Sequence, residues 1–413
     1  MGLESIVIIG GGPGGFTTAE QLRRRGFDGS LTVVDPEGLP YDRPPLSKDY
    51  LTGAKHAEAL LFQQAQWYQD HQIEVIADRA VSLHPQTGAV ELASGQQLPA
   101  DRAVLATGGR PRRLPIPGGD AECVQTLRTR QDADSLRGSV RPGSRAAIIG
   151  AGLIGAETAS SLRTLDAEVV LIDTVDPPLV PAVGAELARQ LHDMHAQHGV
   201  QTITGSCREI GPGQTEHTIV LQDGTEVHAD VVLVGVGITA VTELAEAAGA
   251  EVADGVIVDE RQRSSIGWLY AVGDAARTRS ADGTLERRAE HWEHAVQSGT
   301  IAAAALLGQD PPPSTAPWFW TDRYGVHVEA VGDMAAEGST VLREQDGQIR
   351  AAFRLAGDGT MLGAAAVDAG LTVRAARRII DRRIVVDPVQ LADPDVPLKK
   401  LMKTSSPTGS PNR

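Results

Sequence analysis

Residues 5–35, SIVIIGGGPGGFTTAEQLRRRGFDGSLTVVD, join two apolar runs through a glycine-rich turn and an amphipathic stretch. The two runs are rich in β-branched residues and predict strands, and the stretch between them predicts a helix. The turn carries the pattern G-x-G-x-x-G at Gly10, Gly12 and Gly15, and Asp35 ends the second run. Such a turn lets the backbone approach a pyrophosphate at the N-terminus of the helix, so the stretch predicts a dinucleotide-binding βαβ unit.

The same pattern returns in residues 145–173, RAAIIGAGLIGAETASSLRTLDAEVVLID, with Gly150, Gly152 and Gly155 in the turn and Asp173 at the end. An acid at that place can bond both hydroxyls of a ribose and would repel a 2′-phosphate, so we expect NADH rather than NADPH here. One chain therefore holds two dinucleotide-binding units. That arrangement suits a hydride donor at one site and a bound cofactor that accepts the hydride at the other.

The composition is that of a soluble globular chain and excludes several classes of function. Of the 413 residues, 41% are apolar and 22% are charged, and the length suggests about two to four domains. The net charge of −15 disfavours nucleic acid, whose phosphates are neutralised by Lys and Arg. No apolar run reaches about 18 residues and the N-terminus lacks a signal peptide, so we expect a cytoplasmic protein without a membrane segment.

Cysteine and histidine are too sparse for a redox pair or a metal site. Cys123 and Cys207 are the only cysteines, and they stand too far apart for a C-x-x-C pair. We interpret them as core thiols in a reducing compartment. The segment YDRPPLSKDYL, at 41–51, follows the first unit where many flavoenzymes carry a redox-active cysteine pair, and it contains none. His291 and His294 have no third ligand nearby in the sequence, so no metal is expected.

The rest of the chain alternates strands and helices in the manner of an α/β protein. Strands that end in a glycine turn are expected at 102–111, 229–238 and 267–276. Residues 293–308, EHAVQSGTIAAAALLG, predict an alanine-rich helix. A proline-rich connector at 309–317 then precedes strands of alternating polarity and a further helix.

Several motifs together resemble one family. They read IVIIGGGPGGFTTAEQLRRRGF, YDRPPLSK, LATGGRPR, LRTRQDADSL, AAIIGAGLIGAETASSL, LYAVGDAA and PWFWTDRYG, and they span residues 5 to about 325. In these motifs the chain resembles the FAD-dependent ferredoxin reductases of bacterial oxygenase systems, relatives of putidaredoxin reductase and rubredoxin reductase. It departs from that family after VGVG (234–237), where ITAVTEL replaces the usual Pro-Asn, and in the strand VHVEAVG that follows the last motif.

The resemblance implies an α/β, glutathione-reductase-like fold with two Rossmann-type dinucleotide-binding domains and a C-terminal α+β domain. The FAD-binding domain would be discontinuous, from 1–110 and 240–315, with the NADH-binding domain inserted at 111–239. The C-terminal domain would cover 316–403. The polar tail at 404–413 is expected to be disordered.

The resemblance also implies residues that bind the two cofactors, FAD and NADH. Those implied for FAD are Gly10, Gly12, Gly14, Gly15, Asp35, Arg43, Lys48, Val81, Ala106, Thr107, Gly108, Arg128, Gly273, Asp274, Trp292 and Trp320. Those implied for the nicotinamide cofactor and its surroundings are Gly150, Gly152, Leu153, Ile154, Gly155, Glu157, Asp173 and Gly237.

Two of these residues, Lys48 and Glu157, are expected to be catalytic. Lys48 would lie near the flavin N5 and stabilise the negative charge that develops as hydride arrives. Glu157 would lie beside the nicotinamide, where it could orient the amide and pair with Lys48. The sequence alone leaves other interpretations open: Lys48 as a solvated charge, Glu157 as a first-turn helix acid, Asp274 as a plain N-cap, and Trp292 and Trp320 as core residues.

The missing cysteine pair decides where electrons can go. An FAD in the first unit must pass its electrons directly to an acceptor, and a flavin takes two electrons as hydride and can release them singly. The expected acceptor is a [2Fe–2S] ferredoxin that serves an oxygenase such as a cytochrome P450 or a ring-hydroxylating dioxygenase. A helix expected at 371–383 places Arg374, Arg377 and Arg378 on one face, which could dock an acidic ferredoxin or could simply be solvated.

Two other functions remain open from the sequence. An NADH oxidase or peroxidase usually needs a redox cysteine near residue 45, and none is present. A flavoprotein whose redox state controls its association, with slow turnover as in apoptosis-inducing factor, is the second. The chain is expected to be a monomer or a weak dimer.

Overall fold

The structure is a computed structural model, and it divides the chain into two compact units. The described residues are 3–211, 213 and 216–402. The first unit is built from the described residues up to Arg112, from Arg128–Gln131 and from Gly237–Pro313; the second is built from Arg113–Leu127, Asp132–Val236 and the described residues from Ser314 on. The tail at 404–413, expected to be disordered, lies outside the described residues.

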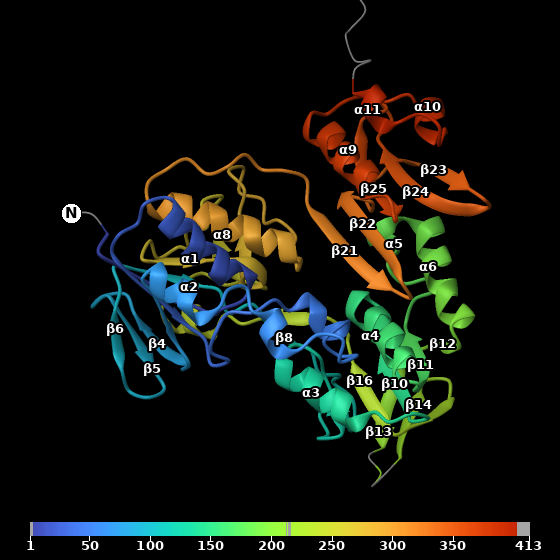
Figure 1. Ribbon diagram of the computed structural model, residues 1–413, viewed down its shortest axis with the longest axis horizontal. Coiled ribbons are helices and arrows are strands. Elements are labelled where there is room, and N and C mark those ends of the chain that lie inside the picture. Colours follow the sequence, from blue (N-terminus) through green and yellow to red (C-terminus); the bar gives the residue numbers. More distant parts are fainter. Residues whose placement is uncertain (1–2, 212, 214–215, 403–413) are drawn as a thin grey trace, which may run out of the picture. The chain divides into compact units, whose positions relative to one another are not determined.

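The first unit is organised around a parallel sheet with the strand order β19-β7-β1-β2-β3 (Figure 1). Its strands are β1 (Ser5–Ile9), β2 (Ser30–Val34), β3 (Ile73–Ile76), β7 (Arg102–Leu105) and β19 (Leu269–Ala271). The first glycine-rich turn connects β1 to the helix α1 (Pro13–Arg24), and β2 returns parallel to β1 with Ser30 opposite Ser5. The predicted βαβ unit is therefore confirmed.

One face of this sheet is covered by α1 and α8 (Trp292–Leu306), whose apolar side chains share a core with β1 and β2. The two helices pack very closely, because a Cβ added to Gly299 would lie only 2.5 Å from the carbonyl oxygen of Gly14. Glycine at this crossing lets the backbone of α8 rest on the first turn of α1. The first glycine turn is thus supported from outside the sheet as well as from β1.

Smaller elements complete the first unit. They are β4 (Ala80–His84), β5 (Ala89–Leu92), β6 (Gln97–Pro99), β8 (Gly109–Pro111), β17 (Ile238–Ala240), β18 (Val256–Val258), β20 (Ala276–Thr278), α2 (Ala65–Asp70), α7 (Glu243–Ala247), and the 3-10 turns η1 (Pro44–Ser47), η2 (Ala57–Leu60) and η3 (Gly273–Ala275). Helix α2 shares the core of α1 and α8, whereas β4, β5, β6, α7, β18 and β20 share the core on the other face of the sheet. Strands β4, β5 and β6 form an antiparallel sheet whose buried residues join the core under β1 and β7.

The second unit contains a second parallel sheet, with the order β12-β11-β10-β16-β9. Its elements are β9 (Val124–Gln125), β10 (Arg145–Ile149), β11 (Glu168–Asp173), β12 (Val200–Thr204), β16 (Val231–Val234), α3 (Arg130–Ser139), α4 (Leu153–Thr164), α5 (Val180–Val183) and α6 (Ala185–Gln197), together with an antiparallel sheet of β13 (Cys207–Gly211), β14 (His217–Leu221) and β15 (Glu226–Ala229). The second glycine turn connects β10 to α4, and β11 pairs parallel to β10, so the second βαβ unit is also confirmed.

The C-terminal residues add an antiparallel sheet to this second unit, ordered β21-β22-β25-β24-β23. Its elements are β21 (Trp318–Arg323), β22 (Val326–Gly332), β23 (Ser339–Gln345), β24 (Gln348–Leu355), β25 (Met361–Val367), α9 (Gly370–Asp381), α10 (Pro388–Ala392) and α11 (Leu398–Leu401). One face of the sheet shares a core with α5 and α6, and the other shares a core with α9, α10 and α11 (Figure 1). The sheet therefore links the C-terminal helices to the second βαβ unit.

The strands predicted to run into glycine turns are shorter than expected, and each is followed by a glycine with positive φ. These glycines are Gly108 (φ 66°), Gly237 (φ 98°) and Gly273 (φ 65°). A left-handed backbone ends a strand, which is the physical reason for the shorter elements. Within the described residues, no helix combines the length and the apolar character needed to cross a bilayer.

The packing of α6 on the C-terminal sheet buries a histidine. His195 is 1% exposed, and its Nδ1 lies 2.7 Å from the hydroxyl of Tyr324. The ring of Tyr324 also stacks on His198, with the ring centres 4.0 Å apart. Burial, with the positive charge of Arg323 adding to it, lowers the pKa of His195 to about 3. His195 is therefore neutral in the folded chain near neutral pH.

We predict that His195 makes the folded state less stable as the pH falls. The pKa of His195 in the folded chain, about 3, lies below the ordinary value of histidine. Below a pH of about 6.5 the unfolded chain therefore binds a proton at this residue that the folded chain does not bind. The stability is fully present above that pH and is lost by at most ~1.4 kcal/mol per pH unit for this one group. Urea unfolding near neutral pH and at a pH of about 5 measures the difference.

A matched pair of variants isolates the effect. His195→Gln should shrink the change in the unfolding midpoint between the two pH values, whatever its own cost in stability. His56→Gln, at an exposed position, should keep the change of the wild type. An unaltered change in His195→Gln would contradict the prediction.

Candidate functional site

The first glycine turn forces β1, α1 and the end of β7 into close backbone contact. A Cβ added to Gly15 would overlap the carbonyl oxygen of Gly10, and one added to Gly10 would overlap that of Ala106. Gly10 also has a φ of 110°, which favours glycine. The amide of Ala106 donates to the carbonyl of Ile9 (2.8 Å), so the segment after β7 forms one wall of this turn.

Both helices that follow a glycine turn begin with an open N-terminus. Gly12 and Gly152 are the N-cap residues of α1 and α4, and neither helix has a capping side chain or an acid in its first turn. A Cβ added to Gly12 would have only Arg43 Nε nearby, at 3.9 Å, and one added to Gly152 would meet nothing within 4 Å. Free amides and the helix dipole at such an end favour an anion, so both ends fit a pyrophosphate.

The two acids that end the second strands hold the glycine turns in shape. Asp35 is buried, and its Oδ2 accepts from the amide of Gly11 at 2.6 Å while its Oδ1 accepts from the amide of Glu37 at 2.8 Å. Asp173 makes the same pair of contacts, with the amides of Ala151 (2.6 Å) and Val175 (3.1 Å). The ribose contacts expected of both acids stay predictions, and the loop contacts are a role that the motif did not reveal.

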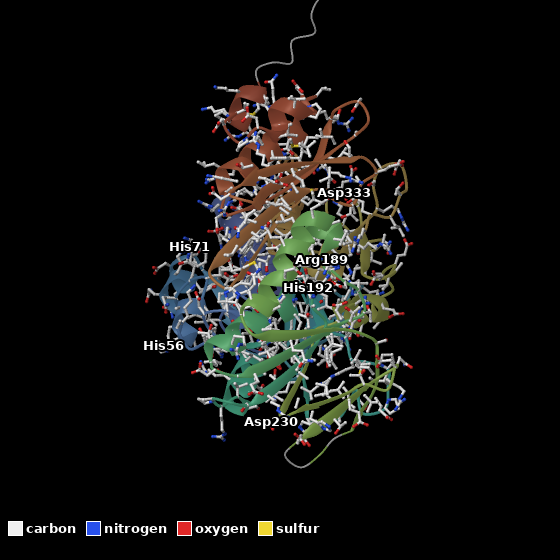
Figure 2. The ribbon with its side chains drawn as sticks, turned by 90° about the vertical axis from the view of Figure 1, so that its right-hand side faces the viewer. His56, His71, Arg189, His192, Asp230 and Asp333 are labelled. Atoms are coloured by element: carbon white, nitrogen blue, oxygen red, sulfur yellow. The ribbon has the colours of Figure 1, made fainter. Side chains whose placement is uncertain are left out.

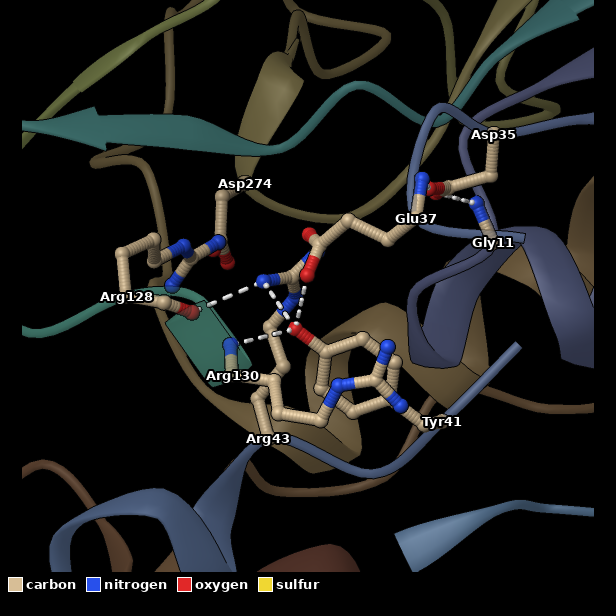
Figure 3. Close-up of polar contacts among 8 residues, drawn as sticks. All are labelled: Gly11, Asp35, Glu37, Tyr41, Arg43, Arg128, Arg130 and Asp274. Atoms are coloured by element: carbon tan, nitrogen blue, oxygen red, sulfur yellow. Dashed lines mark hydrogen bonds and ion pairs between the residues drawn. The ribbon is translucent and has the colours of Figure 1, made fainter. Parts of the chain in front are cut away.

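Arg43 lies at the centre of a polar network beside the first turn (Figure 3). Its Nη1 donates to the carbonyl of Arg128 at 2.7 Å, and its Nη2 lies 3.3 Å from Glu37 Oε1. The hydroxyl of Tyr41 bonds Glu37 Oε2 at 2.6 Å and accepts from the amide of Arg130 at 3.1 Å. Burial raises the pKa of this hydroxyl, which keeps it a donor. Sequence reasoning found Arg43 and Arg128 but missed Glu37 and Tyr41.

Arg128 and Asp274 form an ion pair within the same unit, with Arg128 Nη2 2.8 Å from Asp274 Oδ2 (Figure 3). A Cβ added to Gly108 would lie 3.0 Å from the same Nη2, so this glycine makes room for the guanidinium. Asp274 lies within η3, and the N-cap position of α8 is occupied by His291. The alternative that Asp274 is a plain N-cap is therefore wrong.

Lys48 follows η1, whose two prolines shape the chain before it, and it is half-buried. Trp292, the first residue of α8, donates its indole N–H to Asp42 Oδ1 at 2.8 Å. Burial raises the pKa of Asp42, and the Trp292 N–H and the charge of Lys48 both oppose that rise. The charge of Lys48 thus acts on a carboxylate that is also bonded by an indole from a distant part of the chain, and the sequence pattern did not reveal Asp42.

Glu157 lies in α4 and is buried, with 4% of its surface exposed. It is the fifth residue of the helix, so the alternative of a first-turn acid is wrong. Its Oε1 accepts from the hydroxyl of Thr321 at 2.7 Å and from the amide of Asp322 at 3.3 Å. Both donors come from β21, and no motif predicted them.

Four further candidate residues lie in α4, in β4 and after β7. Leu153 and Ile154 begin α4, and Ile154 is 42% exposed. Val81 is 47% exposed and sits at an irregularity in the β4–β5 pairing. Thr107 donates its hydroxyl to the carbonyl of Val241 at 2.7 Å. Their contacts with cofactors stay predictions.

The last sequence candidates, Trp320, Gly237 and the two cysteines, each make a contact within their own unit. Trp320 stacks on Trp318 with the ring centres 5.1 Å apart. Gly237 belongs to the first unit, and its carbonyl accepts a hydrogen bond from the amide of Arg112 in the same unit. Cys123 and Cys207 both pack against the core of the second parallel sheet, as expected of structural thiols. In the described part of the chain, no group of three His, Cys, Asp or Glu side chains could hold a metal ion.

The chain is similar to known proteins over nearly its whole length. A family model described as pyridine nucleotide-disulphide oxidoreductase matches residues 4–299, and one described as reductase C-terminal matches residues 318–402. A ferredoxin–NAD(+) reductase subunit of a benzene 1,2-dioxygenase system from Pseudomonas putida is 36% identical over 393 residues, which cover 94% of this chain and 95% of that protein.

Two solved structures match over nearly their full length. A covalent complex of putidaredoxin reductase with putidaredoxin matches with a TM-score of 0.91 at 31% identity, covering 98% of this chain and 99% of that chain. The ferredoxin reductase for the CYP199A2 system of Rhodopseudomonas palustris also matches at 0.91, with 32% identity over 96% of this chain and 99% of that chain. At these identities the likeness extends beyond the fold.

We predict that Gly155→Ala disables the second glycine turn. The added Cβ would overlap the carbonyl oxygen of Gly150, so α4 would have to move away from β10. Binding of NAD(+), measured by calorimetry, should be lost or weakened at least tenfold, since a loss of ~1.4 kcal/mol already has that effect. The control is Gly138→Ala in α3, where a Cβ meets nothing within 4 Å; it should be neutral or stabilising by about 0.5 kcal/mol. Wild-type affinity in Gly155→Ala would refute the role given to this contact.

Proposed function

The chain belongs to the pyridine nucleotide-disulphide oxidoreductase family, among the ferredoxin–NAD(+) reductases of oxygenase systems, and we propose that it carries electrons from NADH through FAD to a [2Fe–2S] ferredoxin. The observation that carries the proposal is the pair of glycine turns, each opening onto an uncapped helix N-terminus. A dehydrogenase domain that works alone needs one such turn. Two turns in one chain suit transfer of hydride from one dinucleotide to another.

The domain assignment follows from the same reasoning. We propose that 1–110 and 240–315 bind FAD, that 111–239 bind NADH, and that 316–403 form the C-terminal domain. The division of the chain into two units near Arg112 and Gly237 supports the first boundaries. The match of the reductase C-terminal model to residues 318–402 supports the last one.

FAD, when bound, accepts two electrons as hydride and returns them one at a time. We propose that the open end of α1 receives its pyrophosphate and that Arg43, fixed by Glu37 and Tyr41, adds positive charge there. Asp274, fixed by Arg128, would bond the ribitol hydroxyls. The ammonium of Lys48 would stabilise negative charge that develops on the flavin ring, an electrostatic role that is strongest in a site that excludes water.

For the nicotinamide cofactor, we propose NADH and assign discrimination to Asp173. Its carboxylate follows β11 beside the open end of α4, where an adenosine ribose would lie. A negative charge at this place opposes the 2′-phosphate of NADPH. Glu157, held by Thr321, would orient the nicotinamide amide.

The electron acceptor is inferred from the cysteines, none of which lies near the first glycine turn in the sequence. Cys123 and Cys207 belong to the core of the second unit, so no thiol pair follows the first glycine turn. Electrons must then leave FAD directly, and a [2Fe–2S] ferredoxin takes them singly. Relatives that serve a dioxygenase and the CYP199A2 system support an oxygenase as the final consumer. We place the protein in the cytoplasm, where NADH is available.

Anaerobic stopped-flow mixing tests the proposed function. The purified chain should show a flavin spectrum that bleaches rapidly with NADH and much more slowly with NADPH. Addition of oxidised putidaredoxin, used as a [2Fe–2S] probe, should then restore the oxidised flavin. A colourless protein that cannot be reconstituted with FAD would end the proposal.

The same instrument separates the two alternative functions. An NADH oxidase would consume oxygen at a rate that matches its oxidation of NADH, without need of an iron–sulfur protein. A redox-controlled binding protein would bleach slowly and turn over slowly with an artificial one-electron dye. Fast dye reduction with little consumption of oxygen is the outcome expected here.

We propose that the C-terminal helix α9 helps to dock the acidic ferredoxin. Arg374 and Arg378 are exposed, one turn apart, and Leu371 beside them is 78% exposed. Arg377 is half-buried, and its Nη2 donates to the hydroxyl of Thr315 at 2.7 Å, so it contributes less to the surface than the sequence suggested. On a chain with a net charge of −15, a local basic patch is what an acidic partner requires.

We predict that Arg374→Glu combined with Arg378→Glu raises the KM for putidaredoxin about tenfold at low salt. The increase should vanish at high salt, because screening removes the attraction between exposed charges. Reduction of the flavin by NADH should not change. A control with the same change in net charge is Arg141→Glu combined with Arg208→Glu, both exposed on other elements. Equal KM values in the two double variants would show that α9 takes no part in docking.

A further inference from the structure

The end of strand β21 is attached to helix α4 by three hydrogen bonds. Thr321 and Asp322 both donate to Glu157 Oε1, at 2.7 and 3.3 Å. One turn farther along α4, Ser160 Oγ accepts from the amide of Tyr324 at 2.8 Å. Residues 321–324 of the C-terminal sheet thus hold the face of α4 that carries Glu157.

We infer that Thr321 is a positioning residue for the nicotinamide end of the NADH site, acting through Glu157. The inference rests on the proposed function and deepens it, because it makes the C-terminal sheet a part of the NADH site. The residue is fully buried (0% exposed) on the side of β21 that faces α4. A hydroxyl in such a place needs a partner, and its partner is the carboxylate.

The hydrogen bonds from β21 restrict the orientation of the Glu157 carboxylate as well as its position. Glu157 has three rotatable side-chain bonds, and burial alone would leave several orientations open to its oxygens. Two donors from β21 converge on Oε1, so the strand holds this oxygen in place and limits the orientations that the carboxylate can adopt. A hydrogen bond to an ionised acceptor is about twice as strong as one between neutral groups, which suits a positioning contact.

A second residue of β21, Arg323, interacts electrostatically with Glu157. Arg323 is 3% exposed, and its Nε and Nη2 have no hydrogen-bond partner among the described residues. Burial lowers the pKa of Arg323, and the charge of Glu157 opposes that effect, so the guanidinium and the carboxylate act on each other. Thr321 holds one oxygen of Glu157, and the nearby charge of Arg323 is opposite in sign to that of a carboxylate.

The test compares ligands that share one end. NAD(+) carries the nicotinamide, and ADP-ribose lacks it but keeps the adenosine and the pyrophosphate. In Thr321→Val, which keeps the shape and removes the donor, we expect the affinity for NAD(+) to fall about tenfold. The affinity for ADP-ribose should stay at the wild-type value, and Thr321→Ser should restore the affinity for NAD(+). Isothermal titration calorimetry measures all of these without turnover.

A matched control separates positioning from general damage. Thr32→Val in β2 also removes a buried hydroxyl that bonds a glutamate, Glu74 Oε2 at 3.3 Å, but it lies in the first unit. It should leave both affinities unchanged. A double-mutant cycle with Glu157→Gln adds a second check, because the effects of Thr321→Val and Glu157→Gln on binding of NAD(+) should not be additive if one acts through the other.

The outcomes distinguish this inference from the proposed function. If the wild type is bleached by NADH but Thr321→Val weakens ADP-ribose as much as NAD(+), the contact is structural only and the inference is wrong. Unchanged binding of both ligands in Thr321→Val would overturn it as well. If the wild type itself binds no NAD(+) and is not bleached by NADH, the proposed function fails first.

Discussion

Both nucleotide-binding turns depend on a contact between backbone atoms that only glycine permits. The Cα of Gly15 rests on the carbonyl oxygen of Gly10, and that of Gly155 rests on the carbonyl oxygen of Gly150. Any side chain at either place would push the helix away from its strand. The open helix ends, which we propose as the pyrophosphate sites, depend on this contact.

The acids after the second strands use their carboxylate oxygens to hold the glycine turns, and the same oxygens are the ones proposed to bond a ribose. Asp35 and Asp173 each accept from an amide of the glycine turn and from an amide of the loop that follows. Hydrogen bonds to a charged group contribute about 1.5–3 kcal/mol each. Replacing either acid to change cofactor preference would therefore loosen the turn as well as alter the proposed ribose contact. A change in preference cannot be separated from that loss unless the replacement still accepts from both amides.

The fold could be predicted from the sequence because its deciding patterns are local. Each βαβ unit lies within about thirty consecutive residues, and the family and the α/β, glutathione-reductase-like fold class are confirmed by the full-length matches. The site was less predictable, because its contacts join distant residues. Asp42 and Trp292 are 250 positions apart, and Glu157 and Thr321 are 164 apart. No spacing rule in a single sequence could pair them.

The same limit applies to the C-terminal residues, whose packing partners lie far away in the sequence. In the sequence a proline-rich connector precedes them, which is typical of a domain boundary. In the structure, Val328, Ala330 and Val367 of their sheet share one core with Leu187 and Leu191 of α6. Removing the sheet would uncover that core and would take away both β21 donors of Glu157. Helix α9 packs on the opposite face of the same sheet. The surface proposed to dock the ferredoxin therefore belongs to the same compact unit as α4, the helix proposed to bind NADH.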